Sequence, residues 1–252
     1  MKLQGALYLL PVGISDAPSG DVFPAINGEI IAGIRHFIVE NVRTARRFIK
    51  RMVPSISIDE LTFYELNRHT DPLEISSFLA PLREGLPMGV MSEAGCPGVA
   101  DPGAMPVRIA QQEGFRVVPL VGPSSILLSL MASGLNGQSF SFHGYLPVEP
   151  AEREKKIREL EAQSRRADIT QIFIETPYRN EKMMESLLKT LRDDTLLCMA
   201  TFVTDPENEK IVTMTVGKWK NKKISIDKFP SIFLFYVPDL MKNSNGKKKN
   251  FI

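Results

Sequence analysis

The sequence predicts an α/β fold, because strand-like and helix-like segments alternate along most of its 252 residues. Short apolar runs of strand length, such as residues 6–10 and 88–91, are bounded by glycine and proline. Between such runs lie segments in which apolar residues recur at helical spacing, and residues 40–52 show this most clearly. This alternation is typical of sheets whose strands pair in parallel.

The elements are predicted in the following order. In the first half, strands are expected at residues 6–10, 36–39, 62–65, 88–91 and 116–120, helices at 26–33, 40–52, 73–83 and 105–113, and irregular chain at 11–24. In the second half, helices are expected at 126–133, 151–165 and 181–191, strands at 140–143, 169–175, 196–202, 210–217 and 232–237, and a solvated hairpin at 218–223. Ser124 or Ser125 is expected to cap the helix at 126–133.

A break in the pattern near residues 119–123 predicts two domains. The first, residues 1–118, is expected to be an α/β domain with parallel pairing. The second, residues 119–240, is richer in strands and is expected to hold a mixed sheet. Residues 241–252 carry several lysines and are predicted to be a basic flexible tail.

Composition limits the classes of function. Hydrophobic residues make up 43% and charged residues 24%, and the net charge is +2, which does not by itself indicate nucleic-acid binding. Two cysteines and three scattered histidines predict neither a disulfide framework nor a metal site. Apolar runs are too short to span a bilayer, so no membrane partner is expected and a cytoplasmic location is the default.

Four loops follow predicted strands, at residues 11–13, 92–97, 122–125 and 175–177. Ligands of open α/β folds bind at the carboxyl ends of strands, so these loops are candidates for one binding site. The loop between residues 91 and 103 is the most informative, since its glycines permit close backbone approach and its prolines fix bends. An ordinary connection that needs these residues only for its turns is the alternative. No dinucleotide fingerprint, P-loop or nucleophile elbow is present.

Several motifs together resemble the tetrapyrrole methylase superfamily, over roughly residues 6–237. Ser92-Glu-Ala-Gly-Cys-Pro97 with Asp101-Pro-Gly103 is similar to the family segment S-D-A-G-T-P…D-P-G. In the same order as in the family, similar segments stand at residues 7–11, 40–46, 116–124, 133–135, 144–147 and 173–179. Within the superfamily, the segments look most like the branch that methylates ribose 2′-hydroxyls of cytidine in small-subunit ribosomal RNA.

The resemblance implies two α/β domains with S-adenosylmethionine bound in the cleft between them. Its methionine part is then expected to contact Pro11, Val12, Ser92, Glu93, Ala94, Gly95, Cys96, Ser124 and Ser125. Its adenosine part is expected to contact Glu175, Thr176, Ala200 and Ser231. Such a zwitterionic ligand needs backbone donors, carbonyl acceptors and one or two carboxylates, and no catalytic metal.

The sequence departs from the family pattern at several positions. Glu93 stands where the family has Asp, one methylene shorter, and Cys96 stands where it has Thr, so Cys96 is expected to be a small loop residue and no nucleophile. In the segment that resembles E-D-T-R-H-T-R, residues 41, 42, 44 and 45 differ. The donor loops are closer to the family than this acceptor segment.

The acceptor segment holds the candidate catalytic residues, Glu40 and Arg43. Glu40 could remove the proton of a ribose hydroxyl, or it could form an ordinary salt bridge to Arg43. Arg43, Arg46, Arg47 and Lys50 share one face, which predicts either a phosphate-contact stripe or a solvated helix face.

For two further residues, contact with RNA is one of the possible roles. Arg179 either contacts the substrate or caps a helix, and Trp219, within the predicted hairpin, would stack on RNA only as a minor alternative.

Three functions therefore remain open. A methyltransferase for ribosomal RNA is preferred, a methyltransferase for a small molecule such as a tetrapyrrole is the first alternative, and a non-catalytic S-adenosylmethionine-binding module is the second. The resemblance also implies a homodimer.

Overall fold

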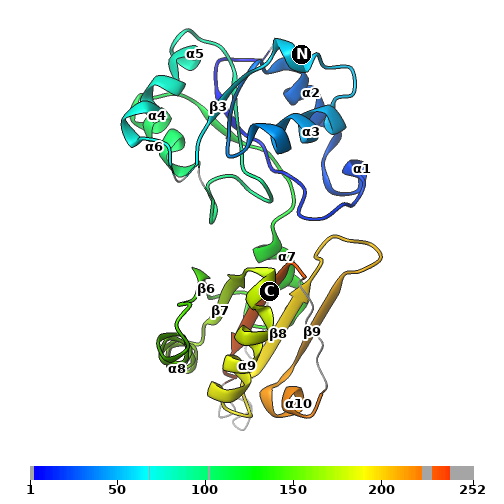
Figure 1. The fold of residues 1–252 in the computed structure, drawn as a ribbon, viewed down its shortest axis with the longest axis vertical. Coiled ribbons are helices and arrows are strands. Elements are labelled where there is room, and N and C mark those ends of the chain that lie inside the picture. The colour runs from blue at the N-terminus through cyan, green and yellow to red at the C-terminus, as the bar shows by residue number, and fades with distance from the viewer. Residues whose placement is uncertain (1–2, 68, 102, 223–228, 239–252) are drawn as a thin grey trace, which may run out of the picture. The chain divides into compact units, whose positions relative to one another are not determined.

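The computed structural model describes residues 3–67, 69–101, 103–222 and 229–238, and they form two compact units. The first unit extends to Ser124 and the second begins at Ser125, a few residues beyond the predicted boundary at 118. The predicted tail at 241–252 lies outside the described residues. Both units combine helices with one five-stranded sheet, as the α/β prediction requires (Figure 1).

The first unit is built around a parallel sheet in the order β3-β2-β4-β1-β5. Its strands are β1 (Leu7–Leu9), β2 (His36–Val39), β3 (Thr62–Glu65), β4 (Met88–Met91) and β5 (Val117–Pro119). Its helices are α1 (Ser19–Val22), α2 (Ala25–Gly33), α3 (Val42–Met52), η1 (Ile58–Glu60), α4 (Pro72–Phe78), α5 (Ala80–Arg83) and α6 (Ala104–Gln112). All five strands were predicted, because each buried strand is a short, nearly continuous apolar run.

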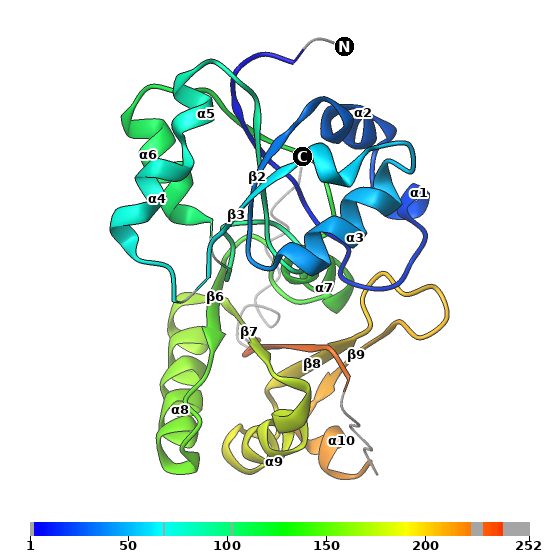
Figure 2. The same cartoon turned by 45° about the horizontal axis from the view of Figure 1, so that its top comes forward.

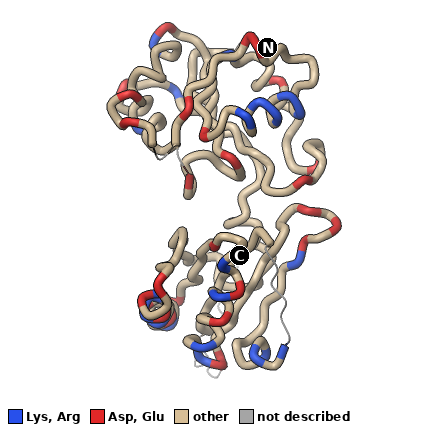
Figure 3. The backbone as a smooth tube through the Cα atoms, in the orientation of Figure 1, with Lys and Arg blue, Asp and Glu red and all other residues tan. Residues whose placement is uncertain are grey.

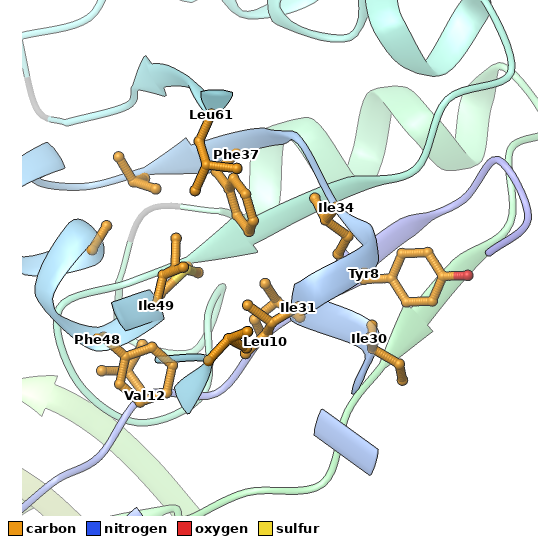
Figure 4. Close-up of a cluster of buried hydrophobic side chains, with 14 of the residues drawn as sticks. Tyr8, Leu10, Val12, Ile30, Ile31, Ile34, Phe37, Phe48, Ile49 and Leu61 are labelled. Atoms are coloured by element: carbon orange, nitrogen blue, oxygen red, sulfur yellow. The ribbon is translucent and has the colours of Figure 1, made fainter. Parts of the chain in front are cut away.

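Helices cover both faces of this sheet (Figure 2). On one face, α2 and α3 pack with the strands around Phe37, Phe48 and Ile49, and Figure 4 shows this cluster. On the other face, α4, α5 and α6 pack around Ile38 and Leu79. Successive residues of β2 thus enter opposite cores, which is why the strand is apolar without alternation.

The connections of β1 and β4 leave these neighbouring strands toward opposite faces. The chain after β1 passes through α1 and α2 to β2, and these helices lie on the Phe37 face. The chain after β4 passes through α6 to β5, on the other face. Such a reversal separates the two loops at the carboxyl edge, where open α/β sheets bind ligands.

The second unit is built around a mixed sheet in the order β6-β7-β10-β8-β9. Its strands are β6 (Phe140–Tyr145), β7 (Thr170–Glu175), β8 (Leu196–Thr201), β9 (Lys210–Thr215) and β10 (Ser231–Tyr236), and only β6 and β7 pair in parallel. Its helices are α7 (Ser125–Ser133), α8 (Pro150–Ala167), η2 (Pro177–Arg179), α9 (Asn180–Thr190) and α10 (Val216–Lys220). One core contains Phe173, Phe233 and Phe235 together with residues of α8, α9 and α10.

Three local predictions were wrong. The segment at 11–24 contains the short helix α1. The helix expected at 73–83 is divided into α4 and α5, since Pro81 lacks the N–H that a continuous helix would need. The hairpin expected at 218–223 is helical in its described part, because Trp219 is buried and its Nε1 donates to the Leu197 carbonyl at 2.8 Å. Trp219 is therefore not available for stacking on RNA.

Candidate functional site

Three predicted donor loops of the first unit meet at the carboxyl edge of its sheet. Val12 and Gly95 form an antiparallel bridge, in which each backbone N–H donates to the other's carbonyl at 2.9 and 3.0 Å. The Cys96 thiol donates to the Pro123 carbonyl at 3.6 Å, which connects the second loop to the third. A Cβ at Gly122 would lie 2.3 Å from the Pro11 Cβ, so the third loop also touches the first.

Gly95 lies at the centre of this arrangement. It is buried and its φ is +69°, a conformation that costs a residue with a Cβ about 1 kcal/mol or more. Beside it, the hydroxyl of buried Ser92 donates to the Ala94 carbonyl at 3.1 Å. The loop at 92–97 is thus fixed at both ends, while Glu93 and Ala94 between them are exposed.

Strand register brings Glu40 to this loop. Because Val39 pairs with Met91 in adjacent parallel strands, the residues that follow them emerge side by side. Asn41 then caps α3, since its Oδ1 accepts from the backbone N–H groups of Arg43 and Thr44 at 2.9 and 3.2 Å. Glu40 therefore lies between the strand and the helix, one residue before the cap.

The Glu40 carboxylate accepts from the backbone N–H of Glu93 at 3.3 Å. Of the ion pairs in the described part of the chain, none involves Glu40 or Arg43, so the alternative of a salt bridge between them does not hold. Glu93, which was expected to face the donor, directs its own carboxylate to Thr44, whose hydroxyl donates to Oε1 at 3.3 Å.

Three carboxylates surround this edge: Glu40, Glu93 and Asp101. Burial raises the pKa of Glu40 above its ordinary value; the Glu93 N–H opposes this shift, and the charges of Asp101 and Glu93 add to it. Burial also raises the pKa of Asp101, the Ser92 hydroxyl counteracts the shift, and the charge of Glu93 increases it. A carboxyl with a raised pKa is a stronger base than a free one, and the cluster as a whole favours a cationic ligand.

The basic face of α3 is exposed, and Figure 3 marks the lysine and arginine positions along the backbone of the helix in blue. Arg46 forms an exposed ion pair with Asp59 at 3.1 Å, and Lys50 donates to the Ile56 carbonyl at 2.9 Å. The side chains of Arg43 and Arg47 are exposed and make no hydrogen bond or ion pair within the described part of the chain, so both guanidinium groups are accessible to a phosphate.

The predicted adenosine residues of the second unit lie at one end of its sheet. Glu175 pairs with Ser231 across β7 and β10, and Thr176 follows directly. Ala200 lies one residue before Thr201, the other partner of Ser231, so the Ala200 side chain enters the opposite face and is fully buried.

Glu175 is the most constrained of these groups. Its side chain is only 1% exposed, and Oε1 accepts from Thr176 N at 2.6 Å and from Arg179 Nε at 2.8 Å. Arg179 is thus a partner of Glu175, and it stands at the N-cap position of α9 without a side-chain capping hydrogen bond. Its expected contact with a substrate stays a prediction. Two buried acceptors, Glu175 Oε2 and Asn180 Oδ1, have no hydrogen-bond donor among the described residues. They match the hydroxyl and amine donors that an adenosine carries.

The chain is similar to curated ribosomal RNA small subunit methyltransferases I. It is 31% identical over 198 residues to the protein of that name from Vibrio cholerae, a match that covers 79% of this chain. The chain spans 65% of the length of that relative. No protein-family model matches.

The fold is that of solved tetrapyrrole methyltransferases. The methyltransferase CobJ superposes with a TM-score of 0.59 at 18% identity, covering 92% of this chain and 94% of that one. Cobalt precorrin-4 methyltransferase, CbiF, gives 0.58 at 15% identity and covers 92% and 95%. The chain thus shares its fold with these two methyltransferases and is similar in sequence to the ribosomal RNA methyltransferases.

Sequence reasoning missed three residues that contact or influence the predicted site residues: Thr44, Asp101 and Asn180. Thr44 contacts the donor loop, Asp101 raises the pKa of Glu40, and Asn180 donates to Ser231 Oγ at 3.0 Å. Asp101 belongs to the motif Asp101-Pro-Gly103, and that motif was a usable signal in the sequence. Thr44 and Asn180 have no such signal, because their roles come from residues distant in sequence.

Among the described residues, no group of three or more histidines, cysteines and acidic residues is placed to hold a metal ion. Within the same residues, no helix is both long enough and apolar enough to cross a membrane.

Proposed function

We propose that the protein transfers a methyl group from S-adenosylmethionine to a ribose 2′-hydroxyl of small-subunit ribosomal RNA. The observation that carries this proposal is the position of Glu40, whose partly buried carboxylate lies beside the converging donor loops and one residue before a basic helix. The curated relatives are named for ribosomal RNA, and this supports the choice of acceptor.

Residues of both units would hold the donor. In the first, the loops at Pro11–Val12 and 92–96, with Ser124, would contact the methionine part, as would Ser125 at the start of the second unit. In the second, Glu175, Thr176 and Ser231, with the backbone of Ala200, would contact the adenosine part. The carboxylates of Glu40, Glu93 and Asp101, near the loop at 92–97, complement the positive charge of the sulfonium.

When bound, S-adenosylmethionine supplies a methyl carbon already activated by its sulfonium leaving group. Glu40 would accept the ribose hydroxyl proton as the ribose oxygen displaces the thioether, with its electron pair, from that carbon. The chain's residues then act by orienting both molecules, which can supply most of the rate, and by accepting that proton. Arg43 and Arg47 would contact RNA phosphates next to the acceptor.

The acceptor is tested by mapping ribose methylation in ribosomal RNA from cells with and without the gene. We expect one or more 2′-O-methyl groups to disappear in the absence of the gene and to return with a plasmid copy. An unchanged map would reject RNA ribose as the acceptor and favour the tetrapyrrole alternative. The ribosomal acceptor implies a cytoplasmic enzyme, and light scattering would test the proposed homodimer.

Replacing Gly122 with alanine is expected to weaken donor binding. The new Cβ would overlap the Pro11 ring at 2.3 and 2.8 Å, and neither group can move without separating the two loops. Overpacking of this kind costs about 1–3 kcal/mol of stability. Calorimetric titration with S-adenosylmethionine and urea unfolding would measure both effects. Gly137→Ala is the matched control, since nothing lies within 4 Å of its Cβ; equal affinities in the two variants would contradict the placement of the donor.

Replacing Arg47 with glutamine is expected to weaken RNA binding at every sequence and to lower the salt dependence. Each phosphate contact contributes about one unit to the slope of log K against log salt, so the slope should fall by about one. Binding of small-subunit ribosomal RNA would be measured at several salt concentrations. Lys156→Gln, an exposed cation on α8, is the control. An unchanged slope in the Arg47 variant would show that this side chain is merely solvated.

A further inference from the structure

Glu93 makes two contacts with the chain around α3, one through its backbone and one through its side chain. Its N–H donates to Glu40 Oε2 at 3.3 Å, and its Oε1 accepts from the Thr44 hydroxyl at 3.3 Å. The residue that holds the proposed base is thus itself held by the helix that follows the base.

Thr44 is well suited to fix the position of Glu93. Its hydroxyl also lies 3.1 Å from the Asn41 carbonyl, and its backbone N–H donates to Asn41 Oδ1 at 3.2 Å. The hydroxyl is therefore shared between two acceptors on a branched side chain with few rotamers in a helix. Hydrogen bonds thus connect the base to the start of α3 through four residues: Glu40, Glu93, Thr44 and Asn41.

The negative charge of Glu93 gives its contact with Thr44 a second effect. The carboxylate of Glu93, held in the first turn of α3, lies where the unpaired N–H groups of a helix favour an anion. Without Thr44, that carboxylate would be free to move in a cluster that already includes Glu40 and Asp101. Like charges repel, so the contact also limits how closely Glu93 approaches the base.

We propose that Thr44 and Glu93 are positioning residues for the base Glu40, so that the helix sets the direction of the carboxylate. This inference rests on the proposed function. Each contact is exposed and weak, but Glu93 makes no other hydrogen bond or ion pair to the residues that the structure describes. A small displacement of a base can lower a rate strongly.

The first test measures hydrogen exchange of the Glu93 amide by NMR in the protein without ligands. Thr44→Val keeps the branched shape and removes the hydroxyl, and it is expected to raise the exchange rate about fivefold to tenfold, the effect of losing one hydrogen bond. Thr44→Ser restores the hydroxyl and is expected to restore slow exchange. Equal exchange in Thr44→Val and the wild type would overturn the proposal.

The second test measures methyl transfer to small-subunit ribosomal RNA. Thr44→Val is expected to lower kcat about tenfold with the KM for the donor unchanged, because the base and not the donor is displaced. Faster exchange with an unchanged kcat would overturn the positioning role. If the wild type transfers no methyl group to RNA, the proposed function fails, whereas the exchange experiment still decides whether Thr44 holds the loop.

Glu93 variants separate geometry from charge. Glu93→Gln keeps an acceptor for Thr44, and it is expected to retain slow exchange while shifting the acidic limb of the kcat profile to lower pH. The shift follows because the charge of Glu93 is one cause of the raised pKa of Glu40, beside burial and Asp101. Glu93→Asp is too short to reach Thr44 and is expected to behave like Thr44→Val. Wild-type behaviour of Glu93→Asp would overturn the proposal.

Discussion

Replacing Glu40 with glutamine is expected to lower the kcat of methyl transfer by about 100-fold or more, the usual contribution of a general base. Glutamine can still accept from the Glu93 N–H, so the local geometry is retained and only the ability to take a proton is lost. The measurement is single-turnover transfer from labelled S-adenosylmethionine to ribosomal RNA that lacks its ribose methyl groups. Glu29→Gln, an exposed acid on α2, is the control and should leave kcat unchanged.

The same substitution is expected to leave the unfolding free energy at neutral pH unchanged or to raise it. Burial raises the pKa of Glu40, so the folded chain binds this proton more tightly than the unfolded chain. The stability contributed by the group is present at low pH and is lost as the pH rises through the ordinary pKa to the raised one. Glutamine does not ionise, so the variant does not lose this stability as the pH rises. A variant that loses both activity and stability would show that Glu40 is structural.

The pH dependence of kcat follows from the same shift. The base acts only when ionised, so activity should rise with pH through the raised pKa of Glu40. In wild-type protein the acidic limb should therefore lie above the ordinary range of a glutamate.

Replacing Arg179 with methionine is expected to destabilise the protein by about 3 kcal/mol. Breaking a buried ion pair from one side costs about 3–5 kcal/mol because the remaining charge is left without a partner. Glu175 is 1% exposed and Arg179 28% exposed, so some water can reach the vacated space and the lower end of the range is expected. Urea unfolding would measure the loss.

Two further variants control this prediction. Arg165→Met breaks an exposed pair with Asp194 at 3.8 Å and should cost at most about 1 kcal/mol. Glu175→Gln combined with Arg179→Met removes the charge as well as its partner, and it should recover part of the lost stability. A loss below about 1 kcal/mol in Arg179→Met alone would mean that the Glu175 carboxylate is not held in this way.

Most of the fold follows from local sequence. Strands such as β2 and β4 are short apolar runs, and α3 has a clear apolar stripe, so their types and bounds were predictable within a few residues. The errors arose where one residue decides the outcome: Pro81 divides a predicted helix, and buried Trp219 belongs to a helix where lysines and asparagine suggested a turn. Local composition does not reveal which aromatic residue becomes buried.

The features of the candidate site also fall into those that the sequence predicts and those that only the tertiary structure decides. By itself, the sequence determined the α/β class, the two-unit plan, the motifs of the donor loops and the resemblance to a family, because each depends on residue types at fixed spacing. The partners of the charged groups were decided only by the tertiary structure. Parallel register sets Glu40 beside Glu93, Asn41 caps α3, and Arg179 forms an ion pair with Glu175. These pairings join elements that are distant in the chain, and only folding brings them within hydrogen-bond distance.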